Sequence, residues 1–335
     1  MISSKYININ RILASATFLI SFIVYFDTMA PSVSYWDCGE FIAVSYTLGV
    51  PHPPGSPLFL LLGRIASMIP ISQDIAFRVN LLSPLVSAFA VLFLYLVIVQ
   101  FVNHWRGKIE SNTDALIAFG AGVVGALTFA FTDSHWFNAV EAEVYAFSTF
   151  FTAIVVWLAL LWSEKADEKG NEKYILIIAY MIGLATGLHL LNLLTIPFVS
   201  LLIYFRKFKF KWNTFGILVA LTGLVFFIIH NVIIKGMPKI ADAIGVPLTG
   251  LLIIAIFAGM IWAILNHKQL MSIVLTSMVL ILIGYSTYAL IFIRSNQDPG
   301  IDENDPETVE AFISYLEREQ YGDVGMLPRR FKGIK

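Results

Sequence analysis

Long apolar runs alternate with short polar segments along most of this chain. A bilayer core is about 30 Å thick, so a helix of roughly 20 apolar residues crosses it. Such runs predict nine membrane-spanning helices, at about 11–29, 79–101, 115–132, 143–163, 174–190, 191–205, 214–234, 249–265 and 271–293. The pair within 174–205 has an alternative, a single re-entrant or kinked segment, because polar residues at 189 and 192 interrupt it.

Lysine and arginine favour one side of this predicted bundle. With nine helices counted, the segments on that side carry Lys5, Arg11, Arg106, Lys108, Lys165, Lys169, Lys173, Arg206, Lys207, Lys209, Lys211 and Lys268. Basic loops stay in the cytoplasm. The opposite, extracytoplasmic side then receives 30–78, 133–142, 235–248 and 294–335, which hold most of the unusual polar residues. We therefore expect any chemistry on that face.

The first extracytoplasmic loop, 30–78, is too long for a plain connector. Its pattern predicts two short interfacial helices, from Cys38 to Leu48 and from Leu58 to Ile69. Past Pro306 the tail turns amphipathic, which predicts one further short helix through 309–316.

Composition agrees with a membrane protein and excludes several other classes. Hydrophobic residues make up 58% of the 335 residues and charged residues only 13%, against about 25% in soluble domains. A net charge of -1 without a stripe of basic residues argues against nucleic acid as a binding partner. The single cysteine, Cys38, excludes an internal disulfide. No phosphate-binding or dinucleotide motif occurs, so no nucleotide or redox cofactor is expected.

Asp37 and Glu40 are the first candidate catalytic residues. Three positions apart, they would share a helix face, and two close carboxylates can divide the work of a general base and an orienting or metal-holding group. The alternative is a capping box, with Asp37 as the N-cap and Glu40 as its partner. Trp36 and Phe41 flank the pair and would hold it at headgroup depth. A divalent cation is the one cofactor left open.

A stiff segment, His52-Pro53-Pro54-Gly55, follows in the same loop. It could hold His52 toward the carboxylates or a bound headgroup, or it could be only a turn before the next helix. Glu141 and Glu143 lie beside the fourth predicted helix. They either line a second wall of the site or cap that helix at its positive end.

Three arginines fall on the extracytoplasmic side, against the charge bias: Arg64, Arg78 and Arg294. Arginine binds phosphate through two parallel hydrogen bonds, so one of them could hold a lipid-linked phosphate, or all could reach lipid headgroups. His189 and Asn192 lie within apolar sequence. They could bind substrate or form an interhelical hydrogen bond.

Sequence blocks around these residues resemble the DUF2723 family. They lie at 36–43, 52–59, 78–83, 139–148, 187–194, 301–306 and 315–322, and follow one another along nearly the whole chain. That family is similar to the GT-C membrane glycosyltransferases, including protein O-mannosyltransferases, whose first external loop carries an acidic pair followed by a His-Pro-Pro element. The resemblance implies a GT-C-like membrane domain at 1–293. It also implies a tail at 294–335 that begins a soluble region, missing or truncated in this chain.

The resemblance further implies a reaction. A multi-pass protein of the inner (plasma) membrane would move mannose or another hexose from a polyprenyl-phosphate donor to Ser or Thr of exported proteins, on the extracytoplasmic (periplasmic) face. The expected step is an inverting displacement with Asp37 as base, and Glu40 and His52 orienting substrate. One of the arginines would stabilise the departing phosphate, and Glu141 and Glu143 would line the far wall. The alternatives are a lipid-linked sugar flippase and a non-catalytic assembly factor.

Overall fold

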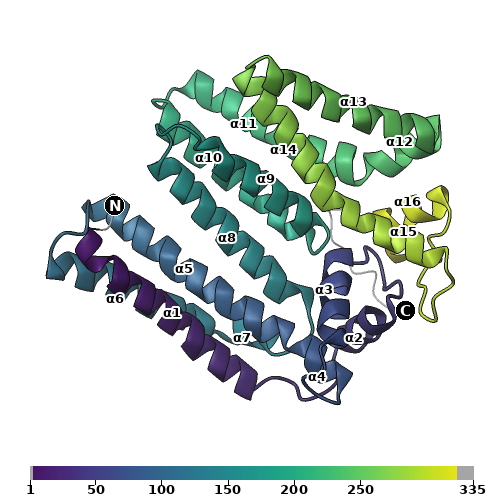
Figure 1. Cartoon of the computed structure of the whole chain (residues 1–335), viewed down its shortest axis with the longest axis horizontal. Helices are drawn as coiled ribbons and strands as arrows, with labels where there is room; N and C mark the ends of the chain where they lie inside the picture. The colour runs from purple at the N-terminus through teal and green to yellow at the C-terminus, as the bar shows by residue number, and fades with distance from the viewer. Residues whose placement is uncertain (1–2, 323–335) are drawn as a thin grey trace, which may run out of the picture.

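The computed structural model describes residues 3–322, which form a bundle of helices (Figure 1). Within this part, eight helical stretches are long and apolar enough to cross a membrane. They are α1 (Ser4–Asp27), α4 with α5 (Ile75–Asn80, Leu82–Arg106), α6 (Asn112–Ala130), α8 (Val144–Glu164), η1 with α10 (Leu190–Leu194, Thr195–Lys207), α11 with η2 (Trp212–Phe227, Ile228–Ile234), α13 (Val246–Leu265), and α14, η3 and α15 (Gln269–Tyr285, Ser286–Tyr288, Ala289–Ser295). The prediction of an all-α polytopic membrane protein is confirmed.

The predicted segment 174–190 forms a shorter helix than expected, α9 (Glu172–Thr186). Fifteen residues rise only about 22 Å, less than the bilayer core of about 30 Å. The helix ends early because Gly187 follows and the backbone at His189 becomes extended, with φ −155°. Taken alone, α9 is too short to be counted as a span, which is why eight stretches qualify and nine were predicted.

The two ends of α9 still lie at opposite ends of the bundle. At its C-terminal end, the Gly187 carbonyl accepts a hydrogen bond of 3.0 Å from the backbone N–H of Leu58 in α3 (Pro57–Met68). In the loop before α9, Asp167 pairs with Lys207 at the far end of α10, 3.1 Å away. The chain therefore reverses direction near His189, as the two-segment prediction requires.

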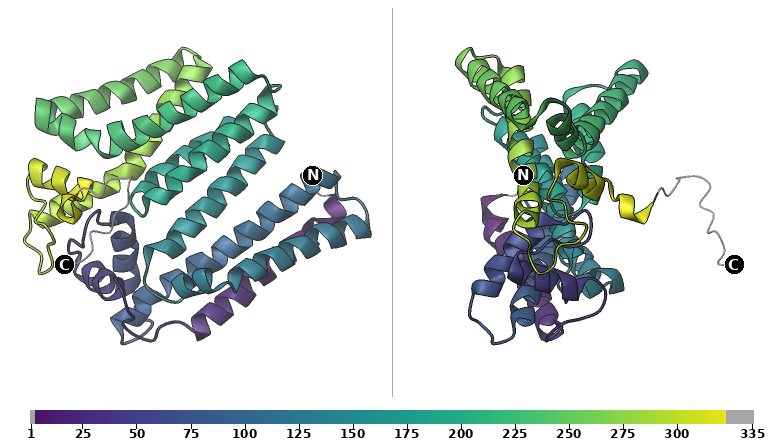
Figure 2. Two further views of the ribbon diagram at one scale, coloured as in Figure 1. Left: turned by 180° about the vertical axis from the view of Figure 1, so that it is seen from behind. Right: turned by 90° about the vertical axis from the view of Figure 1, so that its right-hand side faces the viewer.

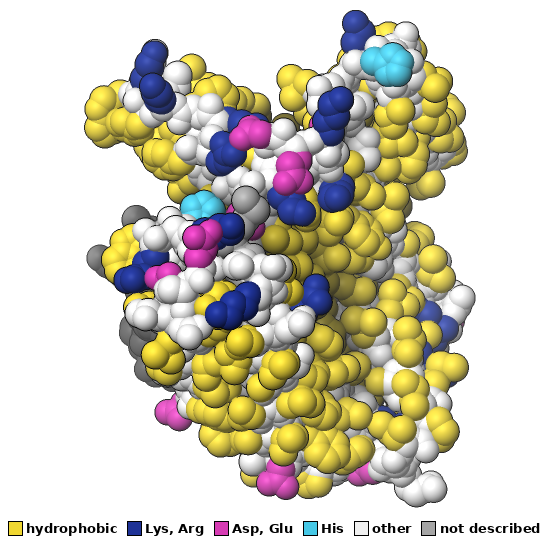
Figure 3. All heavy atoms as spheres, turned by 60° about the vertical axis from the view of Figure 1, so that its left-hand side comes forward, with side chains coloured by type: hydrophobic (Ala, Val, Ile, Leu, Met, Phe, Trp, Pro, Cys, Tyr) yellow, Lys and Arg dark blue, Asp and Glu magenta, His cyan; other side chains and the backbone are white. Residues whose placement is uncertain are grey.

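Basic side chains gather at the end of the bundle where α1 begins, as Figure 3 shows. The loops there carry the lysines and arginines that were predicted to lie together, such as Arg106, Arg206 and Lys207. Two of them, Arg206 and Lys207, bind the carboxylate of Asp167 across the gap between loops. One end of the bundle is thus distinctly basic, and its cytoplasmic placement stays a prediction.

The opposite end carries the short helices. They are α2 (Cys38–Thr47), α3, α7 (Asp133–Ala139), α12 (Gly236–Ile244), α16 (Val309–Glu317) and η4 (Glu319–Tyr321). The two short helices predicted in the first loop and the one predicted in the tail are present, and Pro57 is the first residue of α3. Their place at the membrane interface stays a prediction. Figures 1 and 2 show α2, α3, α15 and α16 grouped at this end. The last part of the predicted tail, 323–335, lies outside the described residues, and the division of the chain at 293 stays a prediction.

Close backbone packing joins the two halves of the bundle between α9 and α14. A Cβ atom on Gly183 would stand 2.6 Å from the carbonyl oxygen of Ile281, and one on Gly284 would meet the backbone of Gly183. Small residues let membrane helices approach closely. The largest apolar core lies beside this contact and extends to α2, α3 and α8, so it supports the helices that carry the predicted site residues.

Candidate active site

Asp37, Glu40 and His52 come together at the start of α2. One carboxylate oxygen of Glu40 accepts a hydrogen bond of 2.6 Å from the backbone N–H of His52, and the other lies 2.7 Å from Nδ1 of the same residue. The ring's Nε2 atom lies 3.9 Å from the carboxylate of Asp37. The side chain of Asp37 is 56% exposed and that of Glu40 22%. One carboxylate therefore faces outward, while the other is tied to the histidine.

The capping-box alternative is wrong. Asp37 does occupy the N-cap position of α2, but its side chain makes no capping hydrogen bond. Glu40 binds His52 instead of returning to the backbone N–H of Asp37. The expectation that Phe41 lies at headgroup depth is wrong, because Phe41 is buried on the inner face of α2 and packs against Phe59. Trp36 is exposed, and its place among lipid headgroups stays a prediction.

The loop that carries His52 is fixed by the tail of the chain. The backbone N–H of Val50 donates to the carbonyl of Ile301 at 2.8 Å, and the N–H of Glu303 donates back to the carbonyl of Val50 at 3.0 Å. These two bonds form the isolated parallel bridge between Val50 and Asp302. The acidic run of the tail thus lies beside the site, although it is about 250 residues away in sequence.

Tyr315 of α16 secures the other side of this loop. Its hydroxyl donates to the carbonyl oxygen of Pro51 at 2.5 Å, and its ring is buried. Gly55 has φ +91°, and a Cβ there would stand 2.6 Å from the Tyr315 hydroxyl. Only glycine combines that backbone conformation with that approach. The interpretation of this segment as a template for His52, rather than a bare turn, agrees with these contacts.

The contacts of His52 set the charges in the site. Its hydrogen bond to Glu40 raises the pKa of His52, and the nearby charge of Asp37 adds to the effect. Burial acts to raise the pKa of Glu40, but the hydrogen bonds from His52 outweigh it and hold that pKa below its usual value. The pair therefore favours a protonated imidazole beside an ionised carboxylate more than the two isolated groups would.

Glu141 and Glu143 lie buried behind the exposed carboxylate. Ser34 donates a hydrogen bond of 2.9 Å to one oxygen of Glu141, while the other oxygen has no partner among the described residues. Glu143 accepts from the N–H of Val144 and caps α8, as one of the two predictions stated. Burial raises the pKa of Glu143 to about 7, and the charges of Asp37 and Glu141 contribute. Glu143 thus holds its proton more tightly than an ordinary carboxyl group does, and it lies near the candidate base.

The three predicted arginines bind backbone carbonyls at helix ends. Arg294 donates through Nε to Leu48 at the end of α2, at 2.6 Å, and Arg64 donates to the same helix end. Arg78 donates through Nη1 to Ser67 at the end of α3, at 2.7 Å. The last carbonyls of a helix lack partners within it, so these cations satisfy them. Their contact with a phosphate stays a prediction.

Asn192 forms the interhelical hydrogen bonds that were the alternative to a substrate contact. Its amide nitrogen donates to Ser148 and its oxygen accepts from Thr152, both in α8 and both at 3.2 Å. His189 accepts from the N–H of Leu191 and is half-buried. Burial lowers the pKa of His189, and the positive charge of Arg318 lowers it further.

The donor atoms of Asp37, Glu40 and His52 lie within 4.8 Å of one another, close enough to share a cation. Both oxygens of Glu40 are engaged by His52, however, which leaves Asp37 and Nε2 of His52 as the outward-facing pair. Two ligands do not complete a divalent-cation shell. The set fits a cation only if substrate oxygens supply further ligands.

A family model described as the protein O-mannosyl-transferase TMEM260 N-terminal domain matches residues 37–212, which is more than half of the chain. The chain belongs to this family. The match begins at Asp37 and includes every predicted site residue except Arg294. The predicted relation of the chain to protein O-mannosyltransferases is thereby confirmed, and the DUF2723 label stays a prediction.

Two named proteins of the TMEM260 family are similar to this chain. Protein O-mannosyl-transferase tmem260 of Dictyostelium discoideum is 32% identical over 225 residues, which cover 63% of this chain and 25% of that protein. Protein O-mannosyl-transferase TMEM260 of Mus musculus is 29% identical over 195 residues, which cover 58% of this chain and 26% of that protein. The chain thus spans about a quarter of the length of these relatives. No solved structure matches.

Sequence reasoning missed the residues that the tail contributes. Tyr315 and Arg318 belong to one of the blocks shared with the family, yet nothing in their spacing indicated a contact with the first loop. Arg318 lies at the end of α16 with its guanidinium over the ring of Tyr321, and it forms no ion pair within residues 3–322. The only available signal was the block itself, because the contacts join segments more than 260 residues apart.

Proposed function

We propose that this chain is a membrane glycosyltransferase. It moves a sugar, mannose or another hexose, from a polyprenyl-phosphate donor to Ser or Thr of exported proteins. Membership of the protein O-mannosyl-transferase TMEM260 N-terminal domain family supports the reaction class. The observation that carries the proposal is the outward-facing carboxylate of Asp37 beside the Glu40–His52 pair. That pair lies at the end of the bundle away from the basic loops, which supports a site on the extracytoplasmic (periplasmic) face of the inner (plasma) membrane.

The proposed step is a single inverting displacement of the GT-C type. Asp37 takes the proton of the acceptor hydroxyl while that oxygen forms a bond to the anomeric carbon of the sugar. The bond from this carbon to the phosphate oxygen breaks, and the polyprenyl phosphate leaves with the electron pair. A positioned base contributes about 10²–10⁴-fold to such a reaction.

Asp37 suits the role of base better than Glu40 does. Both oxygens of Glu40 accept hydrogen bonds from His52, which lowers the pKa of Glu40 and makes it a weaker base. Asp37 is more than half exposed and makes no such bond. Glu40 then positions His52, and the protonated ring of His52 places a positive charge where the phosphate departs.

The remaining predicted residues take different parts in the proposal. Glu141 and Glu143 form the buried wall behind Asp37, where a protonated Glu143 can donate a hydrogen bond to the sugar. Arg64 is bonded through one nitrogen, so it is the predicted arginine that can best turn toward a phosphate. His189 can contact substrate, whereas Asn192 is engaged between helices. A divalent cation would use Asp37, and it would use Nε2 of His52 only with the ring neutral, which is the alternative to the charged role above.

An assay with membranes that contain the full chain tests this proposal. The membranes receive a polyprenyl-phosphate-linked hexose and an acceptor peptide, and mass spectrometry follows the peptide. Transfer predicts a hexose-sized gain on the peptide. A flippase predicts movement of the donor between leaflets with an unmodified peptide, and an assembly factor predicts neither change.

A further inference from the structure

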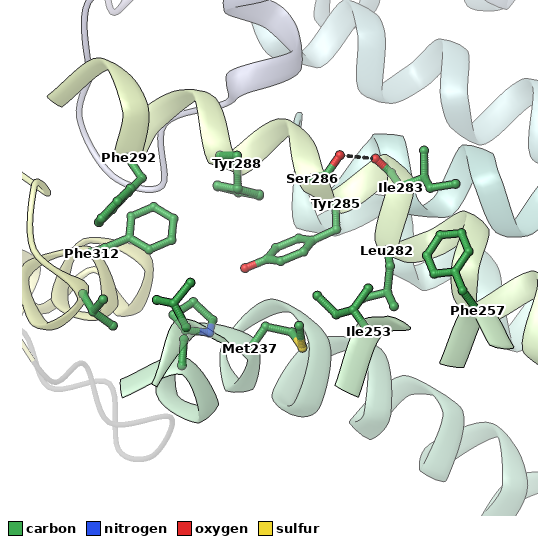
Figure 4. Close-up of a pocket in the computed structure, with 15 residues that line it drawn as sticks. Met237, Ile253, Phe257, Leu282, Ile283, Tyr285, Ser286, Tyr288, Phe292 and Phe312 are labelled. Atoms are coloured by element: carbon green, nitrogen blue, oxygen red, sulfur yellow. Dashed lines mark hydrogen bonds between the residues drawn. The ribbon is translucent and has the colours of Figure 1, made fainter. Parts of the chain in front are cut away.

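A second feature is an apolar cavity of about 460 Å³ beside α16. Figure 4 shows it between α12, α13, the α14–α15 run and α16, with Phe257 toward one end and Phe292 and Phe312 toward the other. Its volume is that of a ligand pocket.

The lining of the cavity is almost entirely apolar. It includes three hydroxyls, and each donates its proton to a backbone carbonyl inside the protein. Ser286 donates to the carbonyl of Ile283 at 2.7 Å, Tyr285 to Ile234 at 2.8 Å, and Tyr288 to Thr186 at 3.2 Å. The rest of the lining is carbon, apart from the thioether of Met237. A polar ligand would lose its hydration without compensation, so the fitting ligand is a hydrocarbon.

The position of the cavity makes a lipid the source of that hydrocarbon. Two of its walls, α13 and the α14–α15 run, are candidate membrane spans. The other two walls are the short helices α12 and α16, which an ion pair of 2.6 Å between Lys239 and Glu317 holds together. The cavity therefore lies where membrane-spanning helices meet the short helices around the site.

α16 connects the cavity directly to the site. Phe312 lines the cavity, and Tyr315, less than one helical turn further on, holds the His52 loop through the carbonyl of Pro51. At the end of the same helix, Arg318 carries a positive charge with no ion pair within the described residues. A lipid with its chain in the cavity would therefore find a cation on the same helix that holds the His52 loop.

We propose that this cavity holds the isoprenoid chain of the lipid phosphate donor, with the phosphate directed toward Arg318. This inference rests on the proposed function, since it assigns a place to the donor of that reaction.

Photocrosslinking tests the assignment with the full chain in phosphatidylcholine nanodiscs. The probe is an isoprenoid phosphate with a diazirine at the end of its chain, and mass spectrometry locates the labelled residues. We expect labels on α13 and α14 in the lining of the cavity. Labels spread evenly over lipid-facing helices such as α11 would overturn the proposal. In a second run, excess unlabelled isoprenoid phosphate or excess phosphatidylglycerol is added as a competitor. Equal loss of labelling with the two competitors would also overturn the proposal.

Variants that fill the cavity provide the matched comparison. Ala241→Trp fills the cavity from α12, and Ala289→Phe fills it from α15. If one variant does not fold, the other still tests the assignment. Each is expected to lower labelling about tenfold or more, because a filled cavity excludes the chain. Ala220→Trp, exposed on α11, is the control and should label as the wild type does. Undiminished labelling in both cavity variants would refute the assignment.

Two further variants separate the parts of the proposal. Arg318→Gln should weaken competition by unlabelled isoprenoid phosphate and leave competition by the corresponding alcohol unchanged, since only the phosphate needs the charge. Equal effects on both would contradict the place given to the phosphate. Asp37→Asn should label normally, because Asp37 serves the reaction and not the chain. Lipid binding and sugar transfer can therefore fail independently.

Discussion

At the scale of single residues, the site depends on different surroundings for two neighbouring carboxylates. His52 engages both oxygens of Glu40 and leaves Asp37 facing outward. The same hydrogen bonds make His52 more basic than an ordinary histidine. Position, exposure and charge therefore support the proposal that Asp37 removes the proton and that the pair beside it gives electrostatic support.

His52→Gln tests the electrostatic role of the ring. The pKa of His52 is raised, so its positive charge is present below that pKa and is lost as pH rises through it. We expect transfer by the variant to fall about 10²-fold, and its pH profile to lack the alkaline decline of the wild type. The measurement is kcat/KM for transfer between pH 6 and 9.

His104→Gln, exposed at the basic end, is the control for this measurement. If His52→Gln shows the same alkaline decline as the wild type, the electrostatic role of His52 is refuted.

Glu143→Gln tests the buried acid through stability. The pKa of Glu143 is raised to about 7, so the folded protein binds this proton more tightly than the unfolded chain does. Its contribution to stability is complete below the usual carboxyl range and is lost as pH rises through about 7. We expect the variant to gain up to about 3 kcal/mol over the wild type at pH 8 and little at pH 5. Thermal unfolding at both pH values measures this, with the exposed Glu110→Gln as control; equal gains at both pH values would contradict it.

Residue-level prediction from sequence succeeded where the partners were close in the chain. Asp37, Glu40 and His52 span sixteen positions, and their residue types and the rigid prolines indicated a common site. The arginines could not be interpreted in this way. Arg294 caps a helix 246 residues away, and no local pattern shows which carbonyls a distant side chain will reach.

At the scale of elements, the contact between α9 and α14 holds the short helix in place. α9 is too short to be fixed by the bilayer alone. Gly183 and Gly284 let its backbone approach α14 without intervening side chains. The predicted boundary at 190 was wrong by a few residues because the break depends on Gly187 and on the extended backbone at His189, which apolar content does not reveal.

Gly284→Ala tests this contact. A Cβ at this position would collide with the backbone of Gly183, which cannot move aside as a flexible side chain does. We expect a loss of about 1–3 kcal/mol, measured as a lower thermal midpoint in detergent. Gly223→Ala is the matched control, because a Cβ on Gly223 meets open space in α11. Equal midpoints for the two variants would show that the close approach contributes nothing.

At the scale of the whole molecule, the two ends of the bundle differ in chemistry. One end carries the basic loops, and the other carries the carboxylates, His52 and the short helices. The alternation of apolar and basic segments predicted this arrangement without any tertiary information. It did not predict that the tail returns to fix the first loop, since that depends on contacts such as Tyr315 to Pro51.

Cysteine labelling tests which side of the membrane each end faces. Cys38 is buried, so the wild type should give little background with a membrane-impermeant maleimide. Tyr35→Cys, exposed beside the site, should react in intact cells with a permeable outer membrane. Lys209→Cys, in the basic loop after α10, should react only after the inner membrane is opened. The reverse pattern would place the site in the cytoplasm.

The central claim is that Asp37 performs sugar transfer to exported proteins. The most direct measurement is the intact mass of exported proteins from cells that contain the wild-type chain, Asp37→Asn or no chain. Asp27→Asn, exposed at the end of α1, is the matched control. We predict a hexose-sized mass increase on at least one exported protein with the wild type and the control, and its absence with Asp37→Asn despite normal protein levels. The same increase with Asp37→Asn would contradict the account.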